Sequence, residues 1–422
     1  MPDISALRCR ECARTFELVD LHVCDFCLGP LEVVYDYERV ASRMGRASVA
    51  GGPRSLWRYR DLLPVDAEAA VDLGAGCTPL VRAERLGAQL GLRELWIKND
   101  TVNPTGSFKD RVVSVALTKA RQLGYKVAAC ASTGNLASAV AAHAAWAGMD
   151  SVVLVPRDLE RAKIQMASVY GGRVIAVDGT YDDVNRLCAE LAGEFATWAF
   201  VNVNLRAYYA EGSKTLAFEI CEQLDWEVPD HVVVPIASGS QLTKVKKGFD
   251  EFGLVGLVTG AGRVRVSGAQ ALGCSPVATA HAAGSDEIVP VRPHTVAKSL
   301  AIGNPADGYY ALQAIAETGG GCAAVTDDAI LEAIRLLART EGIFAETAGG
   351  VTIASLLQLV EDGTIAPHER VVAIVTGHGL KTVEALSDRL EVAPAIPPTL
   401  DAFCELVEGL DEATPLAVGG RS

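Results

Sequence analysis

Short apolar runs alternate with longer amphipathic stretches through most of the chain. The runs are rich in β-branched residues, and the stretches between them, such as DDAILEAIRLLART, place apolar residues at helical spacing. Strands that are buried on both faces read as continuous apolar runs, so this alternation predicts parallel sheets covered by helices. The predicted strands are residues 94–98, 126–131, 151–156, 173–178, 198–202, 231–236, 263–269 and 371–376.

The pattern is different at the two ends of the chain. Residues 1–38 form a cysteine-rich unit that ends in the β-type run LEVVYDY, and residues 39–76, which contain GGPRS, read as a connecting arm. The regular alternation begins near residue 77. Residues 399–422 are rich in Pro, Ala and Gly, and we expect them to form a C-terminal tail.

Composition excludes several classes of protein. The 422 residues are 50% hydrophobic and 21% charged, which is typical of a globular protein with a large core. The net charge of −14 argues against binding nucleic acid or an anionic membrane through bulk charge. The longest apolar stretch, residues 136–149, is too short to span a bilayer, and the N-terminus lacks a secretory pattern. We therefore expect a cytoplasmic protein.

Lys109 is the first candidate for chemistry. It lies in PTGSFKDR, just after the predicted strand 94–98, where a turn leads into a helix. The positive end of a helix lowers the pKa of a nearby lysine, and a lysine with a lowered pKa suits Schiff-base formation. Taken alone, the motif also fits a surface lysine in a capping turn.

Three further junctions between strand and helix carry polar residues, and ligands of α/β sheets bind at such strand ends. Ser132, Thr133 and Asn135 open a helix where free N–H groups could hold a carboxylate. The small-residue turn 237–243, ASGSQLT, suits a phosphate but lacks the spacing of dinucleotide or ATP motifs. Thr376 ends the last predicted strand. A lysine, an amide, a phosphate cradle and a strand-end hydroxyl together suit pyridoxal phosphate.

These motifs resemble a known family. PTGSFKDR, STGN and TGHGLK are similar to motifs of the threonine synthases, which are fold-type II pyridoxal-phosphate enzymes, and NLRAYYAEGSKT, SLAIGNP and EGIFAETAGG agree with them. The resemblance runs from about residue 77 to about residue 381. It implies a tryptophan synthase β-like fold of two open, mostly parallel sheets flanked by helices. The implied parts are a large cofactor-binding domain of residues 77–125 and 205–398 and a small mobile domain of residues 126–204.

The resemblance also implies a role for each matching residue. Lys109 would hold the cofactor as a Schiff base and act as the principal acid and base, Asn135 would contact the ring hydroxyl, and Thr376 would bond the pyridine nitrogen. The cofactor phosphate would be held by Ser238, Gly239, Ser240, Gln241 and Leu242. The substrate would be held by Ser132 and Thr133 at its carboxylate and by Lys98, Arg111 and Arg206 at its phosphate.

Two of these cations can be ranked by geometry. Arg111 follows Lys109 by two residues, about 200° around a helix, so it would point away if Lys109 faces the cofactor. Lys98 ends a strand on the side where ligands collect. We therefore rank Lys98 above Arg111 for the substrate phosphate.

The implied activity is the conversion of O-phospho-L-homoserine and water to L-threonine and phosphate, in a homodimer. Two departures keep other readings open: the loop ASGSQLT, and His378, where relatives often have aspartate. One alternative is a paralogous β- or γ-replacement enzyme for another amino acid, such as a cysteate synthase or a natural-product enzyme. Another is a non-catalytic binding or regulatory protein with the same fold.

Four cysteines near the N-terminus form a separate candidate site. Cys9-x₂-Cys12 and Cys24-x₂-Cys27 have the spacing of a zinc ribbon. A metal-free reduced unit remains the alternative. Residues 1–42 carry a net charge of −4, which is the wrong sign for binding a nucleic-acid backbone. The other seven cysteines lie singly in apolar segments and are expected to be buried thiols.

Overall fold

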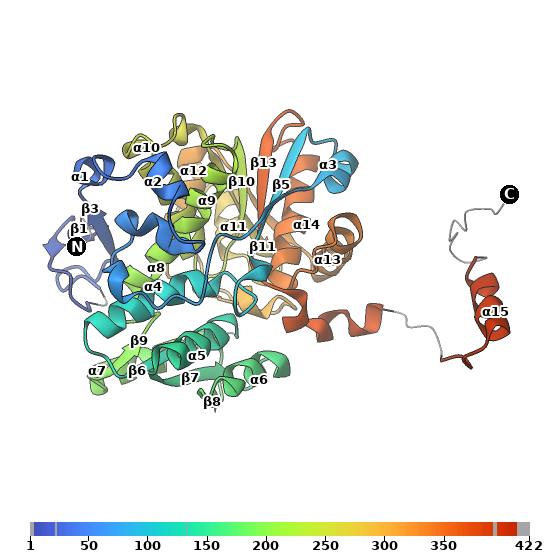
Figure 1. Cartoon of the computed structure of the whole chain (residues 1–422), viewed down its shortest axis with the longest axis horizontal. Helices are drawn as coiled ribbons and strands as arrows, with labels where there is room; N and C mark the ends of the chain where they lie inside the picture. The colour runs from blue at the N-terminus through green and yellow to red at the C-terminus, as the bar shows by residue number, and fades with distance from the viewer. Residues whose placement is uncertain (1–3, 22, 133, 391–394, 412–422) are drawn as a thin grey trace. The chain divides into compact units, whose positions relative to one another are not determined.

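The computed structural model describes residues 4–21, 23–132, 134–390 and 395–411. The chain divides into two compact units, Met1–Ala385 and Leu386–Ser422 (Figure 1). The first unit contains the sheets and the cavity described below. Within the described part of the second unit, α15 spans Leu400–Asp411 and is amphipathic.

The largest sheet has six strands in the order β12-β11-β10-β13-β5-β4. All neighbouring pairs are parallel except β4 with β5. Its strands are β4 (Leu80–Arg82), β5 (Glu94–Asn99), β10 (His231–Pro235), β11 (Arg265–Ala271), β12 (Cys322–Val325) and β13 (Arg370–Val375). The fully buried valines of β10 and β13 account for the continuous apolar runs in the sequence.

A second sheet has four parallel strands in the order β8-β7-β6-β9. Its strands are β6 (Val127–Ala131), β7 (Asp150–Pro156), β8 (Arg173–Val177) and β9 (Trp198–Phe200). Successive side chains of β6 face opposite ways, so Ala129 and Ala131 pack in one buried cluster with Val184 of a flanking helix, whereas Cys130 packs in another. Helices therefore cover both faces, as the sequence predicted.

Helices surround both sheets (Figure 1). The helix α14 packs along β10, β11, β12 and β13, while α5 and α7 pack against β6 and β7. The helices of the first unit are α1 (Tyr37–Ala41), α2 (Arg46–Ala50), α3 (Glu84–Leu90), α4 (Lys109–Gln122), α5 (Asn135–Ala147), α6 (Arg161–Val169), α7 (Tyr181–Glu194), α8 (Arg206–Glu211), α9 (Thr215–Gln223), α10 (Ser240–Leu254), α11 (Pro276–Ala282), α12 (Gly308–Thr318), α13 (Asp327–Glu341) and α14 (Thr347–Glu361).

The N-terminal residues form a small antiparallel sheet in the order β2-β1-β3. Its strands are β1 (Ile4–Cys9), β2 (Thr15–Phe16) and β3 (Leu31–Tyr35). It lies beside α8, where the Tyr35 hydroxyl donates to Glu211 at 2.8 Å (Figure 1). The cysteine-rich unit thus packs on the α/β body through buried polar bonds.

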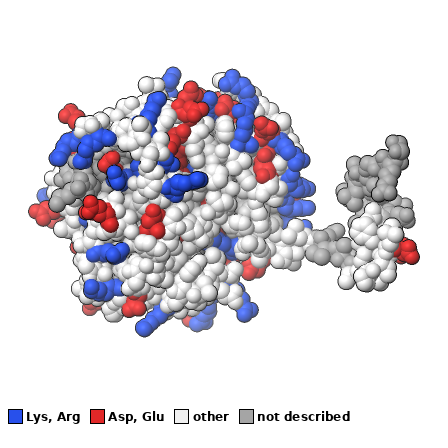
Figure 2. All heavy atoms as spheres, viewed as in Figure 1, with Lys and Arg blue, Asp and Glu red and all other residues white. Residues whose placement is uncertain are grey.

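The predicted fold class is confirmed, since two mostly parallel sheets flanked by helices are present. The division into domains at 77–125, 126–204 and 205–398 stays a prediction, although the four-stranded sheet falls inside 126–204. Across the described residues, helices long and apolar enough to cross a membrane are absent. Figure 2 shows acidic and basic side chains intermixed on the face in view, so the net charge forms no single-sign field there.

Candidate functional site

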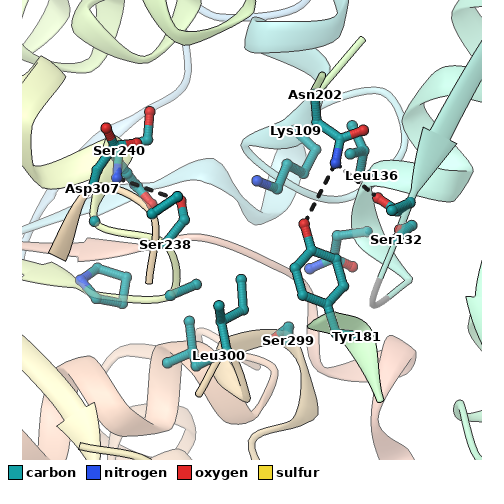
Figure 3. Close-up of a pocket in the computed structure, with 18 of the residues that line it drawn as sticks. Lys109, Ser132, Leu136, Tyr181, Asn202, Ser238, Ser240, Ser299, Leu300 and Asp307 are labelled. Carbon is teal, nitrogen blue, oxygen red and sulfur yellow. Dashed lines mark hydrogen bonds between the residues drawn. The ribbon is translucent and has the colours of Figure 1, made fainter. Parts of the chain in front are cut away.

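A cavity of about 300 Å³ lies at the carboxyl ends of β6, β10 and β13. Its wall contains Lys109 at the start of α4, Asn135 at the start of α5, residues 237–241 before and at the start of α10, and Thr376 after β13. The fold therefore brings the four polar junctions of the sequence to one place. In Figure 3, the Lys109 amine points into the space between these walls.

Lys109 is the first residue of α4, and its Nζ donates to the Tyr209 hydroxyl at 3.0 Å. Burial lowers the pKa of Lys109 to about 8, although the Glu346 carboxylate and Cys130 act in the opposite direction. Near neutral pH an appreciable fraction of this amine is therefore unprotonated. That form can attack a carbonyl carbon or accept a proton.

The loop that precedes Lys109 is fixed on both sides. The Phe108 N–H donates to the Thr376 carbonyl at 2.8 Å, which ties the lysine to the end of β13. Asp110, on the far side of Lys109, accepts from the Thr105 N–H at 2.9 Å and lies 3.0 Å from His143 Nε2. Because these bonds are buried, the lysine has a defined direction into the cavity.

The loop before α5 is built around one serine and one glycine. The Ser132 Oγ accepts from the Gly134 and Ala137 N–H groups at 2.9 and 2.8 Å, so its own hydroxyl proton is available to a ligand. Gly134 has a φ of +119°, and a Cβ there would lie 2.1 Å from Lys163 Cδ. Thr133, which the resemblance also assigns to the substrate carboxylate, lies outside the described residues.

Glu346 is a site residue to which the sequence analysis assigned no role. It is fully buried, lines the cavity and accepts from Asn135 Nδ2 at 2.7 Å, while its Oε2 has no partner. An acidic residue just before the helix run TAGG is a recognisable signal, because a helix N-terminus stabilises a carboxylate. Glu346 brings a negative charge close to Lys109.

The turn before α10 forms a cradle of backbone N–H groups. Gly239 has a φ of +92°, and a Cβ there would lie 2.5 Å from the Asp307 carbonyl oxygen, so a side chain cannot fit without movement. Ser238 and Ser240 face the cavity (Figure 3). The buried Gln241 Nε2 has no partner. Free helix N–H groups with an unpartnered donor suit an anionic phosphate.

Two candidate residues have side chains outside the cavity wall. Leu242 is fully buried within the first turn of α10. His378 is half-buried, and its Nδ1 accepts from the Leu380 N–H at 3.1 Å, so it caps its own turn. Its ring packs edge-on against Phe344 with the centroids 5.9 Å apart.

Arg206 is the first residue of α8 and lines the same cavity. Its Nη2 lies 2.6 Å from Asp307 Oδ2 and remains partly exposed. Nearby, Asn202 Nδ2 donates to Asn185 Oδ1 at 3.2 Å and to the Tyr181 hydroxyl at 3.4 Å (Figure 3). This wall combines one cation with several neutral polar groups.

The structure places Lys98 and Arg111 away from the cavity wall. Both are fully buried. Lys98 Nζ donates to Glu219 at 2.6 Å and to the Thr78 carbonyl at 2.7 Å, and Arg111 bonds Asp100 at 2.7 Å and Glu219 at 2.5 Å. This arrangement does not favour the sequence-based ranking, because both cations are fully buried outside the cavity wall, where each contacts Glu219. We therefore do not carry either forward as a phosphate ligand.

The residues present fit pyridoxal phosphate. Asn135 Oδ1 and Gln241 Nε2 are buried polar atoms without partners, and both belong to residues of the cavity wall. Residues 238–241 of the cradle and Lys109 line the same cavity. The donors that the cofactor needs are therefore gathered around one cavity.

The four N-terminal cysteines also lie together. The Sγ atoms of Cys9, Cys12, Cys24 and Cys27 lie within 4.8 Å of one another, with Cys9–Cys27 at 3.4 Å and Cys12–Cys24 at 3.6 Å. A tetrahedron with metal–sulfur bonds of about 2.3 Å has edges of about 3.8 Å, so the donor set fits zinc.

Comparison with known proteins agrees with this geometry. Residues 71–377 match the family described as pyridoxal-phosphate dependent enzymes. The chain is 41% identical over 382 residues to a threonine synthase of Methanocaldococcus jannaschii, covering 90% of this chain and 93% of that protein. It is 38% identical to a threonine synthase of Methanosarcina acetivorans, covering 96% and 98%.

Solved structures with the same fold include proteins of other activities. Maize serine racemase superposes with a TM-score of 0.62 at 22% identity, covering 78% of this chain and 98% of that one. A fungal L-serine ammonia-lyase from Rhizomucor miehei superposes with a TM-score of 0.64 at 22% identity, covering 75% of this chain and 99% of that one. At this identity the likeness concerns the fold alone.

Proposed function

The chain belongs to the threonine synthase family of pyridoxal-phosphate dependent enzymes, and from this membership we propose that it converts O-phospho-L-homoserine and water to L-threonine and phosphate. One observation carries the proposal: among the described residues of the cavity wall, Lys109 and Arg206 are the cationic side chains. A lysine amine and a fixed guanidinium in one cavity match an amino acid that carries a phosphate at its far end.

Lys109 is the residue that moves protons. Bound pyridoxal phosphate would withdraw electrons from Cα of the substrate. The Lys109 amine would take the Cα proton and then a Cβ proton as phosphate leaves from Cγ, and it would return protons at Cγ and Cα, with water adding at Cβ. Its hydrogen bond to Tyr209 keeps the amine directed into the cavity.

Arg206 and Ser132 orient the substrate from its two ends. The Arg206 guanidinium, held by Asp307 at 2.6 Å, is a donor for the phosphate group of the substrate. The Ser132 hydroxyl and the N-terminus of α5 hold the carboxylate. We no longer assign Lys98 and Arg111 to the substrate.

The test is a direct comparison of two phosphorylated amino acids. Purified protein loaded with pyridoxal phosphate should release phosphate from O-phospho-L-homoserine and form threonine, identified by chromatography. O-phospho-L-serine should be a much poorer substrate. Preferred turnover of O-phospho-L-serine would instead point to a paralogous replacement enzyme. Protein that binds no cofactor would point to a non-catalytic role.

We propose a structural zinc ion at Cys9, Cys12, Cys24 and Cys27. The proposal is supported by four thiol sulfur atoms that lie within 4.8 Å of one another. Metal analysis of protein prepared without chelators should find about one zinc per chain. A preparation without zinc that is fully folded and active would contradict it.

We further propose a homodimer that works in the cytoplasm. The family resemblance supports the dimer, and the eleven cysteines, all free thiols in this structure, suit a reducing compartment. Light scattering after gel filtration would measure the mass, and a monomer at working concentration would contradict the dimer.

A further inference from the structure

The first pair of candidate metal ligands is joined to the α/β body by the two residues between them. Arg10 and Glu11 separate Cys9 from Cys12, and both contact Tyr310. The Arg10 guanidinium carbon lies 3.7 Å from the centre of the Tyr310 ring. The Tyr310 hydroxyl donates to the Glu11 carboxylate. The turn of residues 9–12, which we call the knuckle, therefore contacts both the ring face and the hydroxyl of Tyr310.

Tyr310 lies in the first turn of α12, three residues after Asp307, which lines the cavity. Asp307 is the N-cap residue of that helix. Its carboxylate accepts from Arg206 at 2.6 Å, and its N–H donates to the Ser238 carbonyl at 2.8 Å. The start of α12 therefore fixes Arg206 and the phosphate cradle at once.

A second, much smaller cavity of about 20 Å³ lies where these elements meet. Arg10 and Leu31 line it from the N-terminal unit, and Arg206, Lys244 and Asp307 line it from the body. Arg10 and Arg206 thus share a wall. A space of this size leaves the guanidinium of Arg206 little room to move towards the N-terminal unit, although its other side faces the larger cavity.

The N-terminal unit is itself held firmly against the same helices. Glu32 accepts from Lys244 of α10 at 2.9 Å. The Tyr35 hydroxyl donates at 2.8 Å to Glu211, which ends the helix that Arg206 begins. These bonds hold the N-terminal unit on α8 and α10, so the contacts that Arg10 and Glu11 make with Tyr310 of α12 start from a fixed position.

We propose that Arg10, Glu11 and Tyr310 are positioning residues for Arg206. By holding the start of α12, they fix Asp307 and thereby aim the guanidinium at the phosphate group of the substrate. The cysteine cluster sets the shape of the knuckle, so the N-terminal unit acts in substrate recognition as well as in stability. This inference rests on the proposed role of Arg206.

The experiment compares Arg10→Ala and Tyr310→Leu with Arg14→Ala. Arg14 is a matched control, since its guanidinium lies 4.3 Å from the Phe26 ring and 3.5 Å from Asp25, all within the N-terminal unit. Each holoenzyme is titrated with inorganic phosphate by calorimetry, and KM and kcat are measured with O-phospho-L-homoserine. Zinc and cofactor contents are measured in the same samples.

We expect Arg10→Ala and Tyr310→Leu to raise both the phosphate Kd and KM by about fivefold or more, with kcat changed by less than about twofold. Zinc and cofactor contents should stay unchanged, and Arg14→Ala should match wild type. Tyr310→Phe, which keeps the stacked ring, should have an intermediate effect and serves if Tyr310→Leu does not fold.

Arg206→Ala separates this inference from the proposed function. If Arg206→Ala weakens phosphate binding but Arg10→Ala and both Tyr310 variants do not, the positioning inference is overturned while the role of Arg206 stands. If Arg206→Ala itself leaves the phosphate Kd and KM unchanged, the proposed role of Arg206 fails first. A fall in kcat with unchanged KM in the Arg10 and Tyr310 variants would also overturn the positioning inference.

Discussion

Asn135 donates a hydrogen bond of 2.7 Å to Oε1 of Glu346. The bond joins the start of α5, which packs on the four-stranded sheet, to the start of α14, which packs on the six-stranded sheet. The second carboxylate oxygen of Glu346 is buried without a partner. One buried pair thus ties the two sides of the cavity together and leaves a negative charge near Lys109.

This charge predicts a pH dependence for cofactor capture. Only the neutral amine of Lys109 reacts, so capture of pyridoxal phosphate by the apoprotein should accelerate as pH rises through about 8. Glu346 raises the pKa of Lys109, so Glu346→Gln should move the midpoint to lower pH. Stopped-flow absorbance from pH 6 to 9.5 measures the profile.

Glu361→Gln is the control for this shift, because Glu361 ends the same helix on its exposed side. Its profile should match that of wild type. A midpoint that moves to higher pH in Glu346→Gln would contradict the assigned direction of the charge effect.

Lys98 and Arg111 form buried ion pairs with Glu219. We expect substitutions in this network to lower stability without weakening substrate binding. Glu219 neutralises both Lys98 and Arg111, and these cations hold the pKa of Glu219 at about 2 although burial alone would raise it. Glu219→Gln leaves buried charge uncompensated, so we expect the free energy of unfolding to fall by about 3–5 kcal/mol in urea denaturation. Lys98→Met should lose less, because Arg111 remains, and its KM should be unchanged.

The lowered pKa of Glu219 also determines how the stability of the fold changes with pH. The pKa of Glu219 is lowered on folding, so its contribution is present above about pH 4.5 and is lost as pH falls towards 2. Lys126→Met, at an exposed lysine, should change stability by less than about 0.5 kcal/mol. A raised KM in Lys98→Met, with stability intact, would restore the sequence-based assignment.

The sequence predicted the strands that are long, apolar and β-branched, with ends within two residues of those observed. It missed β4, which has three residues, and β12, whose sequence CAAV lacks the β-branched pattern of the other strands. It also missed β1 and β2 in the cysteine-rich unit, whose sequences ISALRC and TF lack that pattern as well. Length and side-chain shape carry the strand signal, so a short edge strand and a strand of small residues give too little of it.

The cavity residues that follow a strand could be predicted, because parallel strands end at a common edge. The partner of Lys98 could not be predicted, because Glu219 lies 121 residues away along the chain. The place of Lys98 at the end of β5 did not tell which way its side chain points. It points to Glu219 and Gln223 of α9.

The cysteine cluster predicts that metal and cofactor can be lost separately. Cys12→Ser should release the metal and lower the thermal midpoint, because one of four ligands is gone. Cofactor absorbance should persist, since Lys109 and the cradle belong to the body. Cys404→Ser, at an exposed cysteine of α15, is the matched control and should keep its metal. Loss of cofactor in step with metal would contradict the prediction.

The last prediction concerns Gly239. With a φ of +92° and the Asp307 carbonyl oxygen 2.5 Å from the site of a Cβ, alanine here would be strained and would push on the start of α12. We expect Gly239→Ala to raise the Kd for pyridoxal phosphate by about tenfold or more, since about 1.4 kcal/mol corresponds to a factor of ten. Spectrophotometric titration of the apoprotein measures it.

Through Asp307, Gly239→Ala should weaken substrate binding as well as cofactor binding. A displaced Asp307 also carries Arg206 with it, because the two are joined at 2.6 Å, so KM for the phosphorylated substrate should rise in the fully loaded variant as well. Gly262→Ala is the control, since a Cβ there would meet no atom within 4 Å. It should leave both constants unchanged. If Gly239→Ala weakened the cofactor alone and left KM at the wild-type value, the cradle and the arginine would be independent, and Asp307 would not be the link between them.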